Sequence, residues 1–221
     1  MTRSPKYPLT DTLENLPAEL LKHGLLELDI DLSKETKESL LRYLDLLLRW
    51  NKVYNLTAIR DATEMVTKHL LDSLSIIPYV PSGRILDVGS GAGLPAIPLA
   101  LVRPELQVTA LDSNQKKVRF ITQAVLELQI QNLAVVHQRA EDYQPRKRYD
   151  TVIARAFSSI PDFISATAHL LVPNGVWLAM KGIRPDIELA ALPSGCKCRE
   201  IISLHVPNLE AERHLVVLVP K

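Results

Sequence analysis

Residues 84–93 read RILDVGSGAG, and this stretch decides the fold. Its first half is a short apolar run of the kind that forms a buried strand, and its second half carries Gly89, Gly91 and Gly93. Glycines allow a tight turn and let a ligand approach the backbone closely. Pro95 follows, where the first turn of a helix tolerates a missing N–H. We therefore predict a strand, a glycine loop and a helix at the start of an α/β domain.

Short apolar runs alternate with helical patterns throughout residues 81–221. The strand candidates are 84–88, 107–112, 133–137, 149–154, 175–180, 201–206 and 214–219. This alternation predicts a mostly parallel, seven-stranded sheet covered by helices on both faces, which is a Rossmann-like α/β fold. Because only seven residues separate the last two runs, we expect them to form an antiparallel hairpin at the edge of the sheet.

Residues 1–80 form a predicted N-terminal helical extension. Leucines between 40 and 48 recur at helical spacing, and Ser33 stands where it would cap that helix. Asp61 and Glu64 have the spacing of a capping box before a second apolar stripe. Asn51 and Asn55 are typical of the turn between two helices.

Composition and charge exclude several classes of protein. The 221 residues are 47% hydrophobic and 23% charged, and the net charge of +1 requires any nucleic-acid surface to be local. Two cysteines, Cys196 and Cys198, provide no disulfide framework and lack the further ligands of a metal site. The segment 1–11 is polar, and no apolar run is long enough to span a bilayer. We expect a cytoplasmic, monomeric protein without a metal.

Three details of the glycine loop favour S-adenosyl-L-methionine over a nicotinamide cofactor. The glycines follow a Gly-x-Gly-x-Gly pattern rather than Gly-x-Gly-x-x-Gly. Asp87 precedes them, where it could hold the methionine ammonium directly or through water. Asp112 ends the next strand, where a carboxylate can accept hydrogen bonds from both ribose hydroxyls. Glu141, or a backbone N–H beside it, is the candidate contact to adenine after the third strand.

The residues after the fourth strand narrow the reaction. Methylation of an exocyclic amine commonly uses an Asn-Pro-Pro-aromatic segment there, whereas this chain has Arg155-Ala156-Phe157. Methylation at a pyrimidine carbon needs a cysteine nucleophile near the same place, and both cysteines lie elsewhere. A ring nitrogen such as guanine N7 carries a free lone pair, so an enzyme acting on it needs positioning but no general base. The residues are compatible with an N7 acceptor without proving one.

Several basic residues are candidates for binding RNA phosphates. Lys116, Lys117 and Arg119 begin the helix after the second strand. Further candidates are Arg146, Lys147, Arg148 and Arg184. Arg155 and Lys181 end the fourth and fifth strands, at the carboxyl edge where open parallel sheets bind ligands, and are the candidates for positioning the acceptor. For any one exposed residue of this kind, a solvated surface charge is the more common explanation.

With these residues in view, the chain resembles the bacterial 16S ribosomal RNA guanine-N7 methyltransferase family, small-subunit methyltransferase G. The resemblance covers nearly the whole chain. The segments that carry it are WNK (50–52), NLT (55–57), HLLDS (69–73), DVGSGAGLP (87–95), LDS (111–113), RAF (155–157), KG (181–182) and ERHLV (212–216).

The resemblance implies a Rossmann-like class I methyltransferase that methylates N7 of guanine 527 (reference numbering) in 16S rRNA. The partner it implies is the assembled small subunit or a late precursor. Family contacts to the cofactor carry over to Gly89, Leu94, Ala140, Glu141 and Arg155, and Arg213 in the last segment joins the candidates for RNA binding. The alternative functions are methylation of another RNA site or of a small molecule, and a non-enzymatic role as a cofactor-binding RNA chaperone.

Overall fold

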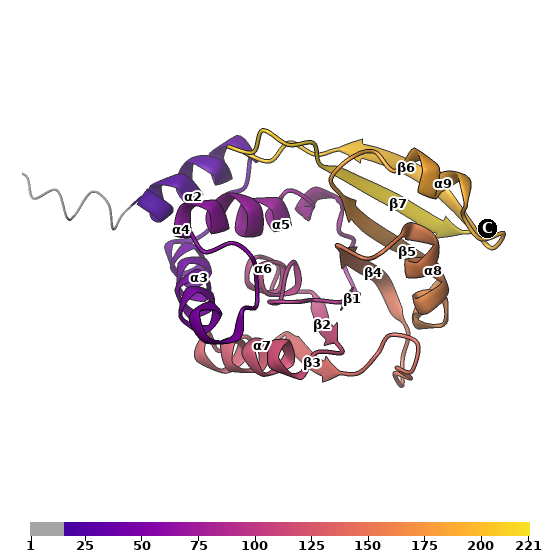
Figure 1. Ribbon diagram of the computed structural model, residues 1–221, viewed down its shortest axis with the longest axis horizontal. Coiled ribbons are helices and arrows are strands. Elements are labelled where there is room, and N and C mark those ends of the chain that lie inside the picture. Colours follow the sequence, from indigo (N-terminus) through magenta and orange to yellow (C-terminus); the bar gives the residue numbers. More distant parts are fainter. Residues whose placement is uncertain (1–15) are drawn as a thin grey trace, which may run out of the picture.

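The computed structural model describes residues 16–221, so the polar segment 1–11 lies outside the described residues (Figure 1). The helices before the sheet are α2 (Leu16–Glu27), α3 (Lys34–Tyr54), α4 (Ala62–Met65), the π-helix η1 (Val66–Leu71), α5 (Asp72–Leu74) and the 3₁₀ helix η2 (Ile77–Tyr79). Those within the α/β region are α6 (Ala96–Val102), α7 (Gln115–Glu127), α8 (Ile160–Thr167), the 3₁₀ helix η3 (Ala168–Leu170) and α9 (Asp186–Ala190).

The strands form one seven-stranded sheet in the order β3-β2-β1-β4-β5-β7-β6. They are β1 (Arg84–Val88), β2 (Gln107–Asp112), β3 (Leu133–His137), β4 (Tyr149–Arg155), β5 (Leu171–Lys181), β6 (Cys196–Ser203) and β7 (His214–Pro220). The first five are parallel, and β7 runs antiparallel to both β5 and β6. The predicted mostly parallel sheet with an antiparallel C-terminal hairpin is confirmed.

The bounds of β4, β5, β6 and β7 differ from the sequence prediction, and those of β6 differ most. β6 spans Cys196–Ser203 rather than 201–206, because pairing with β7 sets its register from Cys196 opposite Pro220 to Ser203 opposite His214. Leu204 and Val206, which looked like strand residues, are buried in the core after the strand has ended. An apolar run shows that residues are buried, but pairing with a neighbour decides which of them are strand.

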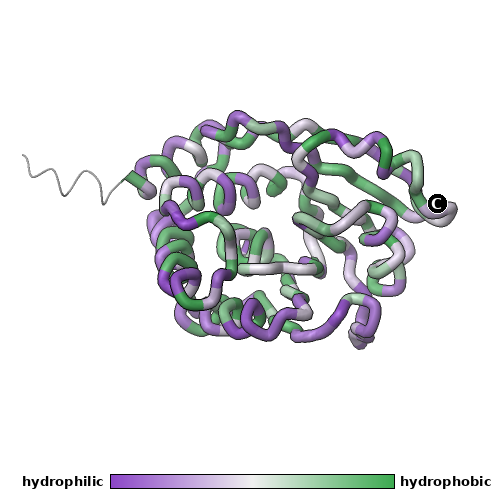
Figure 2. The backbone as a smooth tube through the Cα atoms, viewed as in Figure 1, coloured by the Kyte–Doolittle hydropathy of each residue, from purple (hydrophilic) through white to green (hydrophobic). Residues whose placement is uncertain are grey.

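Consecutive residues of the central strands enter two different hydrophobic clusters. On β1, Ile85 belongs to the cluster that the N-terminal helices share, and Leu86 belongs to the cluster on the opposite face. This follows from the alternation of side chains along a strand. Figure 2 shows hydrophobic strands at the centre, with hydrophilic and hydrophobic residues alternating along α3 and α7.

The helices before residue 80 pack on the first of these faces. Ser33 caps α3 as predicted, and its hydroxyl accepts a hydrogen bond from the Thr36 N–H at 3.2 Å. Leu40, Leu44 and Leu47 of α3 are buried in the same core as residues of α6 and α7. The helical extension and the sheet therefore share one core, and a domain boundary at residue 80 stays a prediction.

Tyr43 ties the extension to the glycine loop. The side chain is fully buried in α3, and its hydroxyl donates a hydrogen bond to the Ala92 carbonyl at 2.8 Å. Burial raises the pKa of this hydroxyl, so it remains protonated as a donor. An element far away in sequence thus holds the turn that begins the α/β domain.

Asp87 holds the other side of the same turn. The side chain is fully buried, and Oδ2 accepts a hydrogen bond from the Ala96 N–H at 3.2 Å, at the start of α6. Oδ1 has no hydrogen-bond partner among the described residues. Burial raises the pKa of the Asp87 carboxyl to about 7, because the charged form loses its water.

We predict that Tyr43→Phe destabilises the protein by about 1–3 kcal/mol, because the buried Ala92 carbonyl loses its donor. Urea unfolding measures this change. Tyr79→Phe is the control, since the Tyr79 ring is 39% exposed. Equal stability of the two variants would contradict the role of the Tyr43 hydroxyl.

We predict that Asp87 makes stability fall as the pH rises from about 4 to about 7. The folded-state pKa is raised, so the folded protein keeps a proton that the unfolded chain has released in this window. The free energy of unfolding of the wild type should therefore decrease relative to Asp87→Asn, by on the order of 1 kcal/mol or more. Unfolding at pH 4.5 and 7.5 checks this, with exposed Asp45→Asn as control; parallel profiles for wild type and Asp87→Asn would refute it.

Candidate functional site

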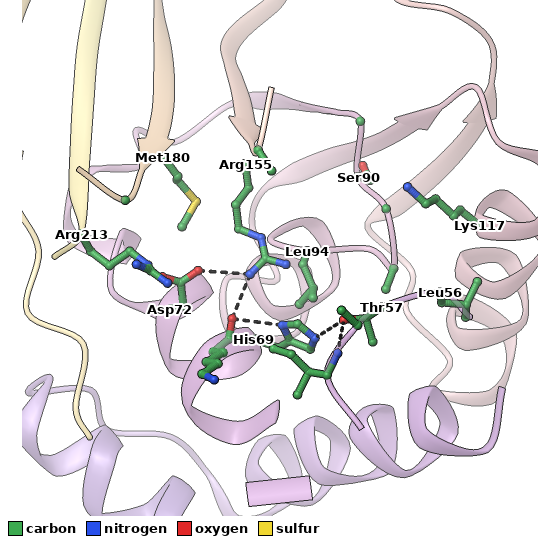
Figure 3. A pocket seen from close by; sticks show the side chains of 18 of the residues that line it. Leu56, Thr57, His69, Asp72, Ser90, Leu94, Lys117, Arg155, Met180 and Arg213 are labelled. Atoms are coloured by element: carbon green, nitrogen blue, oxygen red, sulfur yellow. Dashed lines mark hydrogen bonds and ion pairs between the residues drawn. The ribbon is translucent and has the colours of Figure 1, made fainter. Parts of the chain in front are cut away.

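A cavity of about 610 Å³ opens at the carboxyl ends of β1, β4 and β5 (Figure 3). The glycine loop and Leu94 form one wall, and residues 56–59, which follow α3, form another. Basic side chains from η1, α7, β4, β5 and the segment before β7 complete the lining. This is the edge of a parallel sheet at which ligands are expected to bind.

The glycine loop is fixed on the end of β2. The Gly89 and Ser90 N–H groups donate to the Leu111 carbonyl at 2.8 and 3.1 Å, and the Gly91 N–H donates to Asp112 Oδ2 at 2.8 Å. Gly89 has φ of 69°, in the left-handed region that favours glycine. A Cβ added to Gly89 would meet no atom within 4 Å, so the loop leaves open space for a ligand.

A second, smaller cavity of about 160 Å³ adjoins the first at Gly89. It brings together Asp112, Ala140 and Glu141, three of the residues predicted to bind the nucleoside part of the cofactor. Asp112 Oδ1 accepts a hydrogen bond from the Asn114 N–H at 2.8 Å, and each carboxylate oxygen retains a lone pair for a ribose hydroxyl. Phe157 also lines this cavity and packs against Phe163 with 5.5 Å between ring centroids.

Asp87 does not line either cavity among the described residues. Its carboxylate is buried behind the loop, where it holds α6. A direct or water-mediated contact to the methionine ammonium stays a prediction.

The larger cavity contains a carboxylate held between two arginines. Asp72 is 3% exposed, and its Oδ2 accepts a hydrogen bond from Arg155 Nη1 at 3.1 Å. Its Oδ1 accepts from Arg213 Nε at 2.8 Å, and Arg155 Nη1 also donates to the Lys68 carbonyl at 3.0 Å. Figure 3 shows Asp72 between the two guanidinium groups.

His69 is a neutral side chain in this cavity. Nδ1 lies 3.0 Å from the Lys68 carbonyl oxygen, which can only accept, so Nδ1 donates and Nε2 accepts from the Thr57 hydroxyl at 3.0 Å. Burial and then the Arg155 charge lower the pKa of His69 to about 4. His69 lies in the π-helix η1, a rare element often found at functional sites.

The predicted RNA-binding lysines and arginines separate into two groups. One group lines the larger cavity and consists of Lys117, Arg155, Lys181 and Arg213. Within it, Lys181 Nζ forms an ion pair with Glu188 Oε2 at 2.8 Å. Lys116 and Arg119 are exposed on α7 and do not line it. Arg155 and Lys181, the candidates for positioning the acceptor, therefore lie in one cavity, where both already bind carboxylates.

Sequence reasoning from the residues missed Asp72 and His69, which entered only through the family segment 69–73. The available signal was an acidic residue within an apolar helical stripe, because a buried charge needs partners. Residue spacing did not identify those partners, since Arg155 and Arg213 lie far away in the chain.

Ala156 marks the segment after β4. It has φ of 68°, in the left-handed region that non-glycine residues rarely adopt, and it lines the larger cavity. Backbone strain of this kind clusters at functional sites.

Related proteins match most of the length of this chain. The chain is 57% identical over 198 residues to the ribosomal RNA small subunit methyltransferase G of Methylobacillus flagellatus, covering 90% of this chain and 96% of that protein. It is 53% identical to the protein of the same name from Pseudomonas syringae pv. syringae, with 91% and 94% covered.

Solved structures share the fold at much lower identity. TrmN from Thermus thermophilus has a TM-score of 0.55 at 20% identity, covering 78% of this chain and 52% of that one. The glycopeptide N-methyltransferase MtfA has a TM-score of 0.57 at 15% identity, covering 67% and 95%. The fold is that of the Rossmann-like class I methyltransferases.

The model of the family described as rRNA small subunit methyltransferase G matches residues 36–216, a range that contains both cavities and the two arginines on Asp72. The chain belongs to the rRNA small subunit methyltransferase G family.

Proposed function

We propose that the protein is an S-adenosyl-L-methionine-dependent methyltransferase of 16S rRNA that modifies N7 of a guanine, at position 527 in reference numbering. The family supports the methyltransferase activity and the small-subunit RNA. One observation carries the choice of acceptor atom. The groups in the cavity that could take a proton are already held in hydrogen bonds or ion pairs.

The residues at the glycine loop fit the cofactor. Asp112, Ala140 and Glu141 line the smaller cavity for the nucleoside, and Gly89 leaves open the passage to the larger cavity. Arg155 faces that larger cavity with N–H groups suited to the methionine carboxylate. When bound, S-adenosyl-L-methionine supplies a methyl group on a positively charged sulfur, which an acceptor lone pair displaces in line.

Among the described residues that line the larger cavity, Asp72 and His69 are the ordinary candidates for a general base. Asp72 is held by two guanidinium groups, and both His69 nitrogens are hydrogen-bonded. Neither cysteine lines the cavity. An acceptor that must lose a proton would therefore find no free general base in these two residues. Guanine N7 carries no proton and needs no such base.

The remaining task of the protein is to position the guanine. Residues 56–59 and Lys181 all line the larger cavity. Asn51 fixes that first segment, because its Oδ1 accepts from the Thr57 N–H at 2.9 Å and its Nδ2 donates to the Ile59 carbonyl at 3.0 Å. A fixed wall restricts the base to the in-line geometry that the transfer needs.

The proposed partner is 16S rRNA within the small subunit or a late precursor, and the proposed setting is the cytoplasm, with the protein acting as a monomer. Within residues 16–221, no helix combines the length and the apolar character needed to cross a membrane.

The test is transfer of radiolabelled methyl groups to small subunits and to naked 16S rRNA, both from a strain that lacks the protein, followed by nucleoside analysis. We expect label in 7-methylguanosine at a single position. Label in another nucleoside, or turnover on small molecules without RNA, would refute the proposal.

We predict that Lys181→Ala raises the KM for RNA about tenfold, because a lysine at the acceptor side contributes a charge-assisted hydrogen bond. The Kd for the cofactor, measured by calorimetry, should change by less than about twofold in the same variant. Lys197→Ala, at an exposed position of β6, is the matched control. Equal losses of RNA and cofactor binding would show that Lys181 serves the cofactor instead.

A further inference from the structure

Some of the positively charged side chains in the larger cavity lack a carboxylate partner of their own. Its lining includes three lysines, two arginines and one carboxylate, Asp72. Each lysine has a carboxylate partner of its own within 4.0 Å. The three pairs are Lys68 with Glu64, Lys117 with Asp112 and Lys181 with Glu188. Arg155 and Arg213 share the single carboxylate of Asp72, so the uncompensated positive charge lies on this pair.

The two guanidinium groups also keep unused donors. Arg155 uses only Nη1 for its two hydrogen bonds, and Arg213 uses Nε and Nη1. Each group carries five N–H bonds, so three on each have no partner among the described residues. Their side chains are 24% and 25% exposed, which leaves these donors accessible from the cavity.

The two arginines stand on different sides of the carboxylate. In Figure 3, Arg155 lies between Asp72 and the side of the glycine loop marked by Ser90, and Arg213 lies on the far side of Asp72. The strand order agrees, because β4 is next to β1 whereas β5 separates β4 from β7. A cofactor on the glycine loop can thus reach Arg155, and Arg213 belongs to the acceptor side.

We propose that Arg213, held by Asp72, forms a phosphate-binding subsite for the RNA backbone next to the target nucleotide, and that Asp72 is its positioning residue. The inference rests on the proposed function and adds a subsite to it. A guanidinium fork binds a phosphate through two parallel hydrogen bonds. Asp72 holds the guanidinium through Nε, so the remaining N–H groups on Nη1 and Nη2 are presented with little loss of side-chain entropy.

The test measures binding to 16S rRNA from a strain that lacks the protein, over a range of salt concentrations. For Arg213→Gln we expect about tenfold weaker binding, and a slope of log K against log salt reduced by about 0.7–0.9, the value for one phosphate contact. The cofactor Kd should change less than about twofold. Arg199→Gln is the control, because it removes the same charge from an exposed position of β6, the outermost strand of the sheet.

Two further variants test the part that Asp72 plays. Asp72→Asn should weaken RNA binding, and the double variant with Arg213→Gln should bind no more weakly than the worse single variant, because both changes remove one interaction. If Asp72→Asn does not fold, Arg213→Lys replaces it. This variant keeps the charge but loses the fork held by Asp72, and we expect it to bind RNA about as weakly as Arg213→Gln.

An unchanged salt slope for Arg213→Gln, or a loss of cofactor affinity as large as the loss of RNA affinity, would overturn the subsite. Additive losses in the double variant, or full RNA affinity of Arg213→Lys, would overturn the positioning by Asp72. A wild type that does not methylate 16S rRNA would refute the proposed function instead, so the two failures are distinguishable.

Discussion

The hydrogen bonds between the glycine loop and the end of β2 are the constraint on which the rest of the site depends. The Gly89 and Ser90 N–H groups bind the Leu111 carbonyl, and the Gly91 N–H binds the Asp112 carboxylate. Asp112 thereby serves the loop and lines the smaller cavity at the same time. Any displacement of the loop would move the walls of both cavities, which Gly89 lines, so the turn must be held rigidly.

The support for that turn comes from both sides. Tyr43, in the helical extension, binds the Ala92 carbonyl, and Asp87 binds the first N–H of α6. Burying a polar group is costly unless it is hydrogen-bonded, and the Tyr43 hydroxyl and Asp87 Oδ2 both are. The extension thus supports the glycine loop and also forms a wall of the larger cavity, through the segment that Asn51 holds.

The chemistry of the larger cavity favours binding over proton transfer. Its one carboxylate is neutralised by arginines, and its one histidine is kept neutral by burial and by the neighbouring Arg155 charge. Such a cavity attracts anions, and among the residues that the structure describes along its walls, neither the carboxylate nor the histidine is free to act as a base. This combination suits the proposed methyl transfer to a ring nitrogen, because RNA must be held by its phosphates while the nitrogen reacts without losing a proton.

The sequence by itself determined the α/β fold and the place of the glycine loop after the first strand, because strand alternation and glycine spacing are local patterns. Local pattern also located Ser33 as a helix cap. It failed at β6, where pairing with β7 sets the ends of the strand. Only the tertiary structure decided that Asp72 holds Arg155 and Arg213, since each partner comes from a different element. The physical reason is that a buried charge finds its partners across space, at separations that no spacing rule along the chain describes.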